Sequence, residues 1–568
     1  MIRRFGAALA ALTLFACSVE KAPPAPAAQA VPRAPIEVQI LAFNDFHGNL
    51  ETPAPVEVSE PDGTKRKITT GGAAHFAAAL TGLRQGHPNT VTVSAGDTIG
   101  ASPLISANYL DEPTIEAMNL LGLEFDSVGN HEFDRGADEL KRMQAGGCAK
   151  FTRRTPCAVE PFGGARFRYL AANVIEADGR TIFPATAIKK FPTPAGTITI
   201  GFIGETLRGT ANIVTPSGVK GLIFKDEADT ANALVPTLQA EGADAIVLLI
   251  HQGGKTSQFT VGNNCNGFTG DIAPIVQRLD PAIAIVVSGH THWAYVCRSA
   301  QQAGASRLLT SAGKYGYFIT DLRLEFDPVT HRLVNQDAHN IVVGKGERGE
   351  DPEIWKLVAR YALAVAPIAN RIIGHLDAPA MNAQDDGESP AADLIADSML
   401  AATRAKENGG AQLALLNATG VRVPLPAGDI KYAAAFEMMP FGNNLVVMTL
   451  TGAQLKAVIE QQYSRARPAA GERPHALATS VGFTYSVDMK QPAGRRVFGC
   501  RLNGRPIEPD ARYRIVVNNY LASGGDGLTL FNQGIDITDR QILDLDALVA
   551  WISPGRTPPK ADRILIVG

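Results

Sequence analysis

The chain has 568 residues, of which 45% are apolar and 19% are charged, and its formal net charge is −3. This length exceeds what one hydrophobic core supports, so we expect two or more domains, and the composition excludes a disordered chain. The small net charge and the absence of long Lys/Arg runs give no support to nucleic-acid polymers or anionic membrane surfaces as partners.

The first residues have the pattern of an export signal. Arg3 and Arg4 precede an apolar stretch over residues 5–16, which is shorter than the roughly 20 residues of a membrane-spanning helix. The stretch ends at Cys17 in Leu-Phe-Ala-Cys, which resembles a bacterial lipobox; an ordinary cleaved signal peptide is the alternative. We predict a lipoprotein signal peptide over residues 1–17 and an Ala/Pro-rich tether over 18–35. The protein would then be exported, either periplasmic or anchored to a bacterial outer membrane by lipid alone.

From Ile36 to about Asp327 the sequence alternates apolar runs with loops and helical patterns, and we predict a first domain over residues 36–345. The helical patterns cover Ala73 to Arg84 and Thr114 to Leu121. Short apolar runs of this kind, bounded by polar residues and glycine, predict an α/β fold whose strands are covered on both faces. The predicted strands are Val38–Phe43, Thr90–Val93, Thr197–Ile203, Ala245–Ile250 and Ile283–Val287.

Metal-binding residue types follow these strands or lie in the loops between them. Because ligands bind beyond the carboxyl ends of strands in α/β sheets, we expect these loops to converge on one site. Carboxylate, imidazole and amide oxygen suit Zn²⁺, Mn²⁺ or Co²⁺ better than Ca²⁺, and one carboxylate can bridge two ions about 3.5–4 Å apart. The motifs are Asn44-Asp45-Phe46-His47-Gly48, Ser94-Ala95-Gly96-Asp97, Gly129-Asn130-His131-Glu132-Phe133-Asp134, His251 and Ser288-Gly289-His290-Thr291-His292.

In this order the motifs resemble those of the calcineurin-like metallophosphoesterases. The resemblance implies a four-layer β-sandwich flanked by helices and two bound divalent metal ions, Zn, Mn or Co. His131 is implied to be a transition-state stabiliser and leaving-group acid, oriented by Asp134, rather than a ligand; a structural role is the alternative. The implied ligands are Asp45, His47, Asp97 and His292 for one ion and Asp97, Asn130, His251 and His290 for the other, with Asp97 bridging.

A connector and a second domain follow. Asp351-Pro352-Glu353 opens a helical run to about residue 372, with proline in the first turn and acidic residues near its start. We therefore predict a linker helix within residues 346–373 and a mixed α/β domain over 374–568.

Three segments of this second domain resemble the substrate-binding segments of the 5′-nucleotidase family. They are Leu416 to Arg422, Met439 to Asn443 and Tyr520 to Gly527. The resemblance implies that Phe441 and Tyr520 sandwich a base by π-stacking, for which core packing is the alternative. It also implies that Asp526 accepts hydrogen bonds from ribose hydroxyls, while Asn417 and Arg422 hold polar edges of the nucleoside or its phosphate.

Two departures from the family pattern leave the substrate open. No arginine stands directly before Glu388-Ser389-Pro390, where 5′-nucleotidases commonly carry one, and Tyr520 replaces the commoner Phe. We predict hydrolysis of a small nucleotide, first of all a nucleoside 5′-monophosphate. A 2′,3′-cyclic nucleotide phosphodiesterase with 3′-nucleotidase activity, or a nucleotide-sugar or diphosphate hydrolase, would use the same metal site. A binding or adhesive surface protein without catalysis is the alternative of another class.

The cysteines also bear on the cellular compartment. Five remain after Cys17, and none has CxxC spacing, which argues against a structural zinc site or a redox motif. Export permits disulfides. Proximity in sequence suggests Cys148–Cys157 and Cys265–Cys297, with Cys500 unpaired, although spacing alone does not fix the connectivity.

Overall fold

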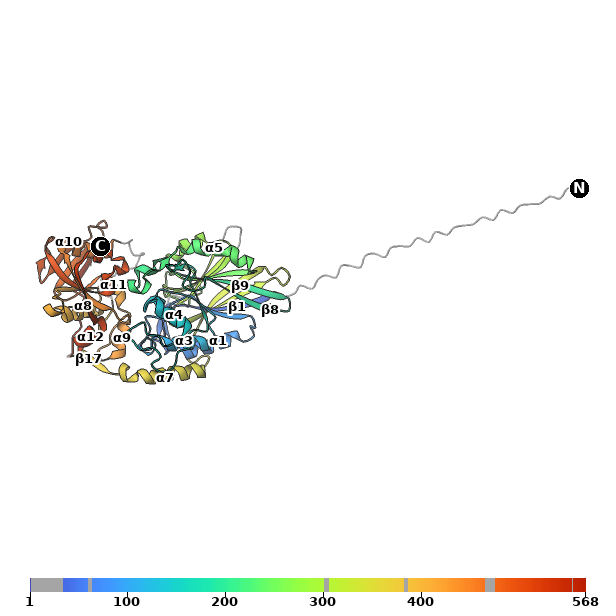
Figure 1. The fold of residues 1–568 in the computed structure, drawn as a ribbon, viewed down its shortest axis with the longest axis horizontal. Coiled ribbons are helices and arrows are strands. Elements are labelled where there is room, and N and C mark those ends of the chain that lie inside the picture. The colour runs from blue at the N-terminus through green and yellow to red at the C-terminus, as the bar shows by residue number, and fades with distance from the viewer. Residues whose placement is uncertain are drawn as a thin grey trace.

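The computed structural model describes Met1 and residues 34–567, except 60–63, 301–305, 383–386, 465–475 and 554. The predicted signal peptide, Cys17 and most of the tether lie outside these residues. The described chain forms two parts joined by one long helix (Figure 1). We call residues 36–342 the N-terminal half and residues 372–567 the C-terminal half. Within the described residues, no helix combines the length and apolar character that a membrane crossing requires.

Two six-stranded sheets stack face to face in the N-terminal half. Strands β1, β4, β5 and β6 run parallel in the first sheet, and β9, β11, β12 and β14 run parallel in the second. In order across the sheets, the first contains β16 (Leu333–Val342), β15 (Phe318–Phe326), β1 (Ile36–Phe43), β4 (Thr90–Ser94), β5 (Phe125–Ser127) and β6 (Arg168–Leu170). The second contains β13 (Ala294–Ala300), β14 (Ser306–Ala312), β12 (Ile283–Ser288), β11 (Ala245–His251), β9 (Gly196–Thr206) and β8 (Thr186–Thr193).

The core lies between the sheets and under the helices outside them. Ile40 and Val91 of the first sheet and Phe202, Val247 and Val287 of the second are fully or almost fully buried in one apolar cluster. Helices cover both outer faces, which completes the four-layer α/β sandwich that the sequence predicts. The helices are α1 (Ala73–Arg84), α2 (Leu104–Ala107), α3 (Glu112–Leu121) and α4 (Ala137–Ala145) by the first sheet, and α5 (Glu227–Ala240) and α6 (Ile272–Arg278) by the second.

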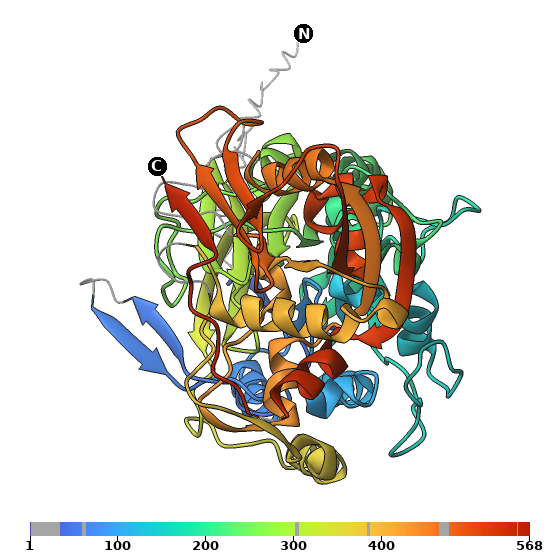
Figure 2. The same cartoon turned by 90° about the vertical axis from the view of Figure 1, so that its left-hand side faces the viewer.

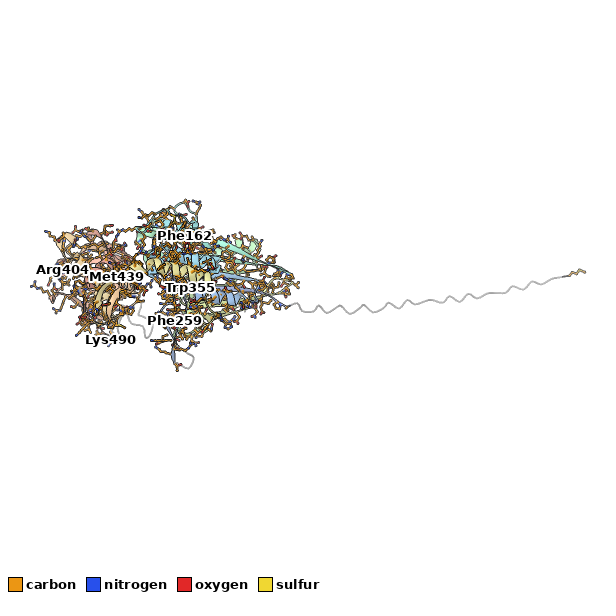
Figure 3. All side chains as sticks on the ribbon, turned by 90° about the horizontal axis from the view of Figure 1, so that it is seen from below. Phe162, Phe259, Trp355, Arg404, Met439 and Lys490 are labelled. Atoms are coloured by element: carbon orange, nitrogen blue, oxygen red, sulfur yellow. A yellow bond between two sulfur atoms is a disulfide. The ribbon has the colours of Figure 1, made fainter. Side chains whose placement is uncertain are left out.

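The connector is helix α7 (Pro352–Ala369). The side chain of Asp351 caps it by accepting hydrogen bonds from the amides of Glu353 and Ile354, and proline occupies its first position, where it needs no amide donor. Its apolar stripe packs against α1, α2 and α3. The helix ends before residue 372, where strand β17 begins, so the predicted run to about 372 is slightly too long. In Figure 3, Trp355 on α7 lies on the side of Phe162 and Phe259 of the N-terminal half, whereas Met439, Arg404 and Lys490 mark the C-terminal half.

The C-terminal half is mixed α/β, with helices packed against its sheets (Figure 2). Its main sheet has the order β21 (Ala478–Thr479), β18 (Leu413–Leu416), β25 (Arg512–Asn518), β20 (Asn444–Thr451), β26 (Ile535–Leu543). A second sheet has the order β24 (Arg505–Pro506), β23 (Val497–Leu502), β22 (Phe483–Asp488), β27 (Ile564–Val567). The helices are α8 (Pro390–Thr403), α9 (Tyr432–Met438), α10 (Gly452–Tyr463), α11 (Asn519–Ala522) and α12 (Asp544–Ile552).

Three two-stranded ribbons complete the described strands. They are β2 (Val56–Ser59) with β3 (Lys65–Ile68), β7 (Val174–Ile175) with β10 (Ile223–Phe224), and β17 (Ile372–Leu376) with β19 (Gly428–Lys431). The disulfides Cys148–Cys157 and Cys265–Cys297 confirm the suggested pairing, and Cys500 is a free thiol.

Candidate metal and substrate site

The parallel strands bring the predicted metal-binding motifs to one edge of the sandwich. The motif of Asp45 and His47 follows β1, and that of Asp97 follows β4. His251 is the last residue of β11, and the motif of His290 and His292 follows β12. Because β1 and β4 are parallel, as are β11 and β12, their carboxyl ends meet across the gap between the two sheets.

Backbone hydrogen bonds fix these loops to one another. The amides of Asp45 and His47 each donate over 2.9 Å, to the carbonyl oxygens of Gly96 and Asp97. The amide of His290 donates to both oxygens of Asp45, over 2.9 and 3.2 Å, and thereby ties the β12 loop to the β1 loop. The site is therefore held by the backbone of both sheets.

The loop conformations are unusual. Asp45, His47, Asp97, His290 and His292 all have positive φ, between 48° and 72°, a region that non-glycine residues adopt rarely. Each such residue costs of order 1–3 kcal/mol, and such costs gather at functional sites. Neighbouring glycines allow close approach: a Cβ on Gly96 would lie 2.8 Å from Nδ1 of His251, and one on Gly129 would lie 2.2 Å from Oδ1 of Asp97.

The predicted ligands form two adjoining groups of donor atoms, which we call the donor cluster together with Asn130. One group contains Asp45, His47 and His292, the other Asp97, His251 and His290, and within each group the donor atoms lie within 4.8 Å of one another. Oδ2 of Asp97 lies 3.0 Å from Nε2 of His251 and 3.6 Å from Nε2 of His47. Asp97 thus stands between the groups, in the place expected of a bridging carboxylate.

The donor cluster fits divalent metal ions. Nδ1 of His47 lies 2.9 Å from the carbonyl oxygen of Gly100, and Nδ1 of His251 lies 2.7 Å from that of Ala95, so both rings direct Nε2 toward the cluster. Oδ1 of Asn130 is buried and has no hydrogen-bonding partner within the described part of the chain. Buried polar atoms seldom lack partners, so this oxygen is suited to binding a cation.

The protonation states of the donor-cluster side chains also suit metal binding. Burial lowers the pKa of His290 to about 4 and holds that of His292 well below its ordinary value, so both rings are neutral at neutral pH, as metal binding requires. Burial opposes the charge on Asp97, but the imidazoles of His251, His131 and His47 outweigh it and hold its pKa well below the usual range. Asp97 is therefore an anion that cations stabilise.

His131 lies beside this cluster at the junction of the two halves. Its Nδ1 is 2.8 Å from Oδ2 of Asp134, as the predicted orienting contact requires. Its Nε2 is 2.9 Å from Nη2 of Arg422, and its ring stacks on Phe441 with the centroids 6.2 Å apart. Burial favours the neutral ring, but Asp134 and Asp97 overcome it and raise the pKa of His131.

A cavity of about 290 Å³ continues from the donor cluster between the two halves. This volume is near the lower end of the roughly 300–1,000 Å³ typical of small-molecule sites. We call it the junction cavity. The N-terminal half contributes Asn130, His131, Asp134, Ile213, Val214, Thr215 and His290; the C-terminal half contributes Asn417, Thr419, Gly420, Arg422, Phe441, Asn443, Asn518, Tyr520 and Asp526. Every residue predicted to bind substrate, and both predicted catalytic residues, therefore line one space.

The hydroxyl of Tyr520 has a structural partner that phenylalanine would lack. It donates to Oδ1 of Asp526 over 2.6 Å and accepts from the amide of Asp526 over 2.9 Å. Thr419 donates to Oδ2 of the same carboxylate over 2.8 Å. Asp526 also has a left-handed conformation, with φ 52°. Two hydroxyls thus already donate to its carboxylate, and a ribose would have to share this carboxylate with them.

Glu132 is a supporting residue whose role the sequence does not predict. Its buried carboxylate accepts hydrogen bonds from the amides of Asp97, Thr98 and Ile99, over 2.9–3.3 Å, and from the amide of Gly129 over 2.8 Å. It therefore ties the Asp97 loop to the loop of Asn130 and His131. Its place next to His131 in the motif was the only signal in the sequence.

Comparisons with known proteins match both halves. Residues 38–294 match the calcineurin-like phosphoesterase family, and residues 372–533 match the 5′-nucleotidase C-terminal domain. Endonuclease YhcR of Bacillus subtilis is 29% identical over 542 residues, covering 93% of this chain and 41% of YhcR. Cell wall protein Lmo0130 of Listeria monocytogenes is 27% identical over 534 residues, covering 89% of this chain and 65% of that protein. The chain thus spans less than two thirds of the length of either relative.

A solved structure has the same arrangement. The crystal structure of a 5′-nucleotidase precursor from Thermus thermophilus superposes with a TM-score of 0.75 at 26% sequence identity. The match covers 94% of this chain and 100% of the other. Both halves, and the way they are joined, therefore have a counterpart in a known protein.

Proposed function

Because the chain belongs to the 5′-nucleotidase family, a family of metal-dependent phosphoric ester hydrolases, we propose that it releases phosphate from nucleoside 5′-monophosphates. Hydrolysis of nucleotide phosphate esters is what the match of both halves supports. The choice of the 5′-monophosphate rests on one observation: the junction cavity runs from the donor cluster to Phe441, Tyr520 and Asp526. A phosphate at one end and a nucleoside at the other would fill it.

We propose that the donor cluster holds two divalent metal ions, which are Zn²⁺, Mn²⁺ or Co²⁺. Asp45, His47 and His292 would hold one ion and Asn130, His251 and His290 the other, with Asp97 shared. Such a pair supplies Lewis-acid polarisation of a phosphoryl oxygen and lowers the pKa of water. Oδ1 of Asn130, which is buried and has no hydrogen-bonding partner among the described residues, supports this assignment.

The side chains around the cluster have separate tasks in this proposal. Hydrolysis forms a bond from water oxygen to phosphorus and breaks the phosphorus–O5′ bond, and the departing O5′ needs a proton. His131, held by Asp134 through Nδ1, presents Nε2 to the cavity and gives that proton. Arg422 now contacts Nε2; its planar fork of donors suits a phosphate, and binding substrate would draw it away from the ring.

Phosphate release from a nucleotide panel tests this function. The panel contains nucleoside 5′-monophosphates, 3′-monophosphates, 2′,3′-cyclic monophosphates, a nucleotide sugar and nucleoside diphosphates, each with and without EDTA. We expect the highest kcat/KM for the 5′-monophosphates, and loss of activity with EDTA that added Mn²⁺, Co²⁺ or Zn²⁺ restores. A higher kcat/KM for the cyclic or diphosphate substrates would replace this choice of substrate, and full activity in EDTA would refute the metal assignment.

We also propose that the protein is exported and anchored through Cys17. The two disulfides support an oxidising compartment. Cys17→Ser should move the protein from the membrane to the soluble fraction, because lipidation needs the thiol. Continued sedimentation of that variant with membranes after a high-salt wash would refute the anchor.

A further inference from the structure

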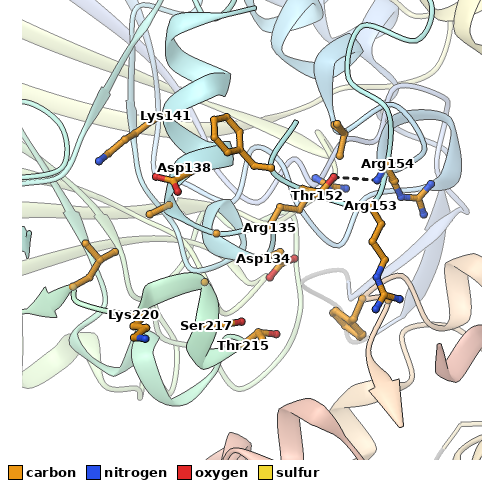
Figure 4. A pocket seen from close by; sticks show the side chains of 18 of the residues that line it. Asp134, Arg135, Asp138, Lys141, Thr152, Arg153, Arg154, Thr215, Ser217 and Lys220 are labelled. Atoms are coloured by element: carbon orange, nitrogen blue, oxygen red, sulfur yellow. Dashed lines mark hydrogen bonds between the residues drawn. The ribbon is translucent and has the colours of Figure 1, made fainter. Parts of the chain in front are cut away.

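A larger cavity adjoins the junction cavity. Its volume is about 860 Å³, and we call it the outer cavity (Figure 4). Asp134, Thr215 and Phe441 line both cavities, so the two spaces meet at these side chains. Asp134 orients His131 and Phe441 is the proposed base-stacking ring. The outer cavity therefore opens on the side of the leaving nucleoside and not on the side of the metal ions.

Cations without acidic partners line the outer cavity. Of its five Lys and Arg side chains, Arg135 pairs with Asp111 and Lys141 pairs with Glu176. Arg153, Arg154 and Lys220 form no ion pair with any carboxylate that the structure describes. Asp134 and Asp138 also line the space, but three unpaired cations against two carboxylates leave it positive.

The two arginines belong to a constrained loop. The disulfide Cys148–Cys157 closes this loop, and the amide of Cys157 donates to both oxygens of Glu112, over 3.0 and 3.1 Å. Glu112 is buried and pairs with Arg142 over 2.7 Å, so the loop is anchored in the interior. Thr152, next to Arg153, accepts a hydrogen bond from the amide of Arg154 and keeps its own hydroxyl hydrogen for another acceptor.

Arg154 and Lys220 lie on different walls. Nη1 of Arg154 donates to Oδ1 of Asn108 over 2.7 Å, a neutral partner that leaves its charge uncompensated. Burial and the charge of Arg135 lower the pKa of Arg154 from its ordinary value. A bound anion would raise this pKa again. Figure 4 shows Lys220 with Ser217 and Thr215 on the wall that faces this loop. Guanidinium, ammonium and hydroxyl groups around one space are what phosphate binding requires.

We propose that the outer cavity is a second phosphate subsite, which binds a phosphate carried by the leaving nucleoside of the substrate. This inference rests on the proposed function and adds to its substrates nucleotides that carry a second phosphate beyond the scissile one. A nucleoside 3′,5′-bisphosphate is the simplest member of this class. Hydrolysis would break only the phosphorus–O5′ bond, release inorganic phosphate and leave the second phosphate on the nucleoside.

The test compares adenosine 3′,5′-bisphosphate with AMP on the metal-loaded protein. In Arg153→Gln/Arg154→Gln, kcat/KM for the bisphosphate should fall about tenfold relative to kcat/KM for AMP, the size expected from two partly exposed charge contacts. Lys150→Gln is the matched control, because Lys150 lies in the same disulfide-closed loop but does not line the cavity. Lys220→Gln, on the facing wall, should lower the same ratio even if the double variant fails to fold.

Two further measurements separate this inference from the proposed function and from a site for free phosphate. Calorimetric titration of both nucleotides tests the subsite without turnover, so weaker bisphosphate binding in the variants would support it even if neither nucleotide were hydrolysed. An unchanged ratio, or an equal loss for both nucleotides, would overturn the proposal. It would also be overturned if the variants weakened inhibition by inorganic phosphate and left the ratio unchanged, since the cavity would then bind free anion.

Discussion

The donor cluster and the far end of the junction cavity are held in different ways. Asp45, Asp97 and His251 are at most 1% exposed, and backbone hydrogen bonds between neighbouring loops fix their positions. Phe441 and Tyr520 in the C-terminal half are only half-buried, and Phe441 rests on His131 of the other half. The difference indicates that the N-terminal half alone preorganises the donor cluster, whereas the far end of the junction cavity depends on how the two halves meet.

Removal of the carboxylate that we propose to be shared by both ions should have the largest effect. Asp97→Asn should lower kcat on every substrate by about 10⁴-fold or more, because a neutral amide cannot bridge two cations. Phosphate release and metal analysis of the purified variant measure this effect. Asp178→Asn, an exposed carboxylate in the same half, is the control. Near-normal turnover with both metals bound would show that Asp97 does not bridge them.

His131→Ala changes the residue that lies between the donor cluster and Phe441. Turnover of nucleotides should fall by about 10²–10⁴-fold, the usual contribution of a general acid, while the metal content stays unchanged. The effect should be smaller for p-nitrophenyl phosphate, whose leaving group needs less protonation. His339→Ala, exposed on β16, is the control. Loss of a metal equivalent would instead make His131 a ligand.

Thr419→Val is the smallest of these changes, and it tests the far end of the junction cavity. It removes the hydroxyl that donates to Asp526 over 2.8 Å and keeps the shape of the side chain. KM for nucleoside 5′-monophosphates should rise about 3- to 10-fold, the value of one hydrogen bond, with kcat nearly unchanged. Steady-state kinetics on AMP measures it. An equal rise in KM for p-nitrophenyl phosphate would place Thr419 in support of the phosphate end.

The sequence was most informative about the N-terminal half, which contains the donor cluster. All five predicted strands are present, α1 has the predicted bounds, and the helix predicted over 114–121 begins two residues earlier, at Glu112. Apolar runs and polar loops determine such elements locally, so they can be read from one chain. The roles proposed for the metal, catalytic and substrate residues, and the predicted domain boundaries, stay predictions.

Contacts between distant segments were not predictable from spacing. The approach of Arg422 to His131 joins residues that lie 291 positions apart. The four amides that Glu132 binds, and the left-handed conformations of five donors, depend on how loops cross after the sheets form. The bond from Tyr520 to Asp526 explains a departure from the family pattern that the sequence left unexplained. The outer cavity likewise cannot be predicted from the sequence, because residues of both halves line it.

The central claim is that one half performs the hydrolysis and the other selects the nucleoside. Its most direct test is the ratio of kcat/KM for AMP to that for p-nitrophenyl phosphate in Phe441→Ala/Tyr520→Ala. Two stacked faces contribute about 1–3 kcal/mol each, with some coupling, so the ratio should fall tens- to thousands-fold while kcat on the small ester is retained. Equal losses on both substrates would mean that these rings support the fold, and the division of labour between the two halves would be wrong.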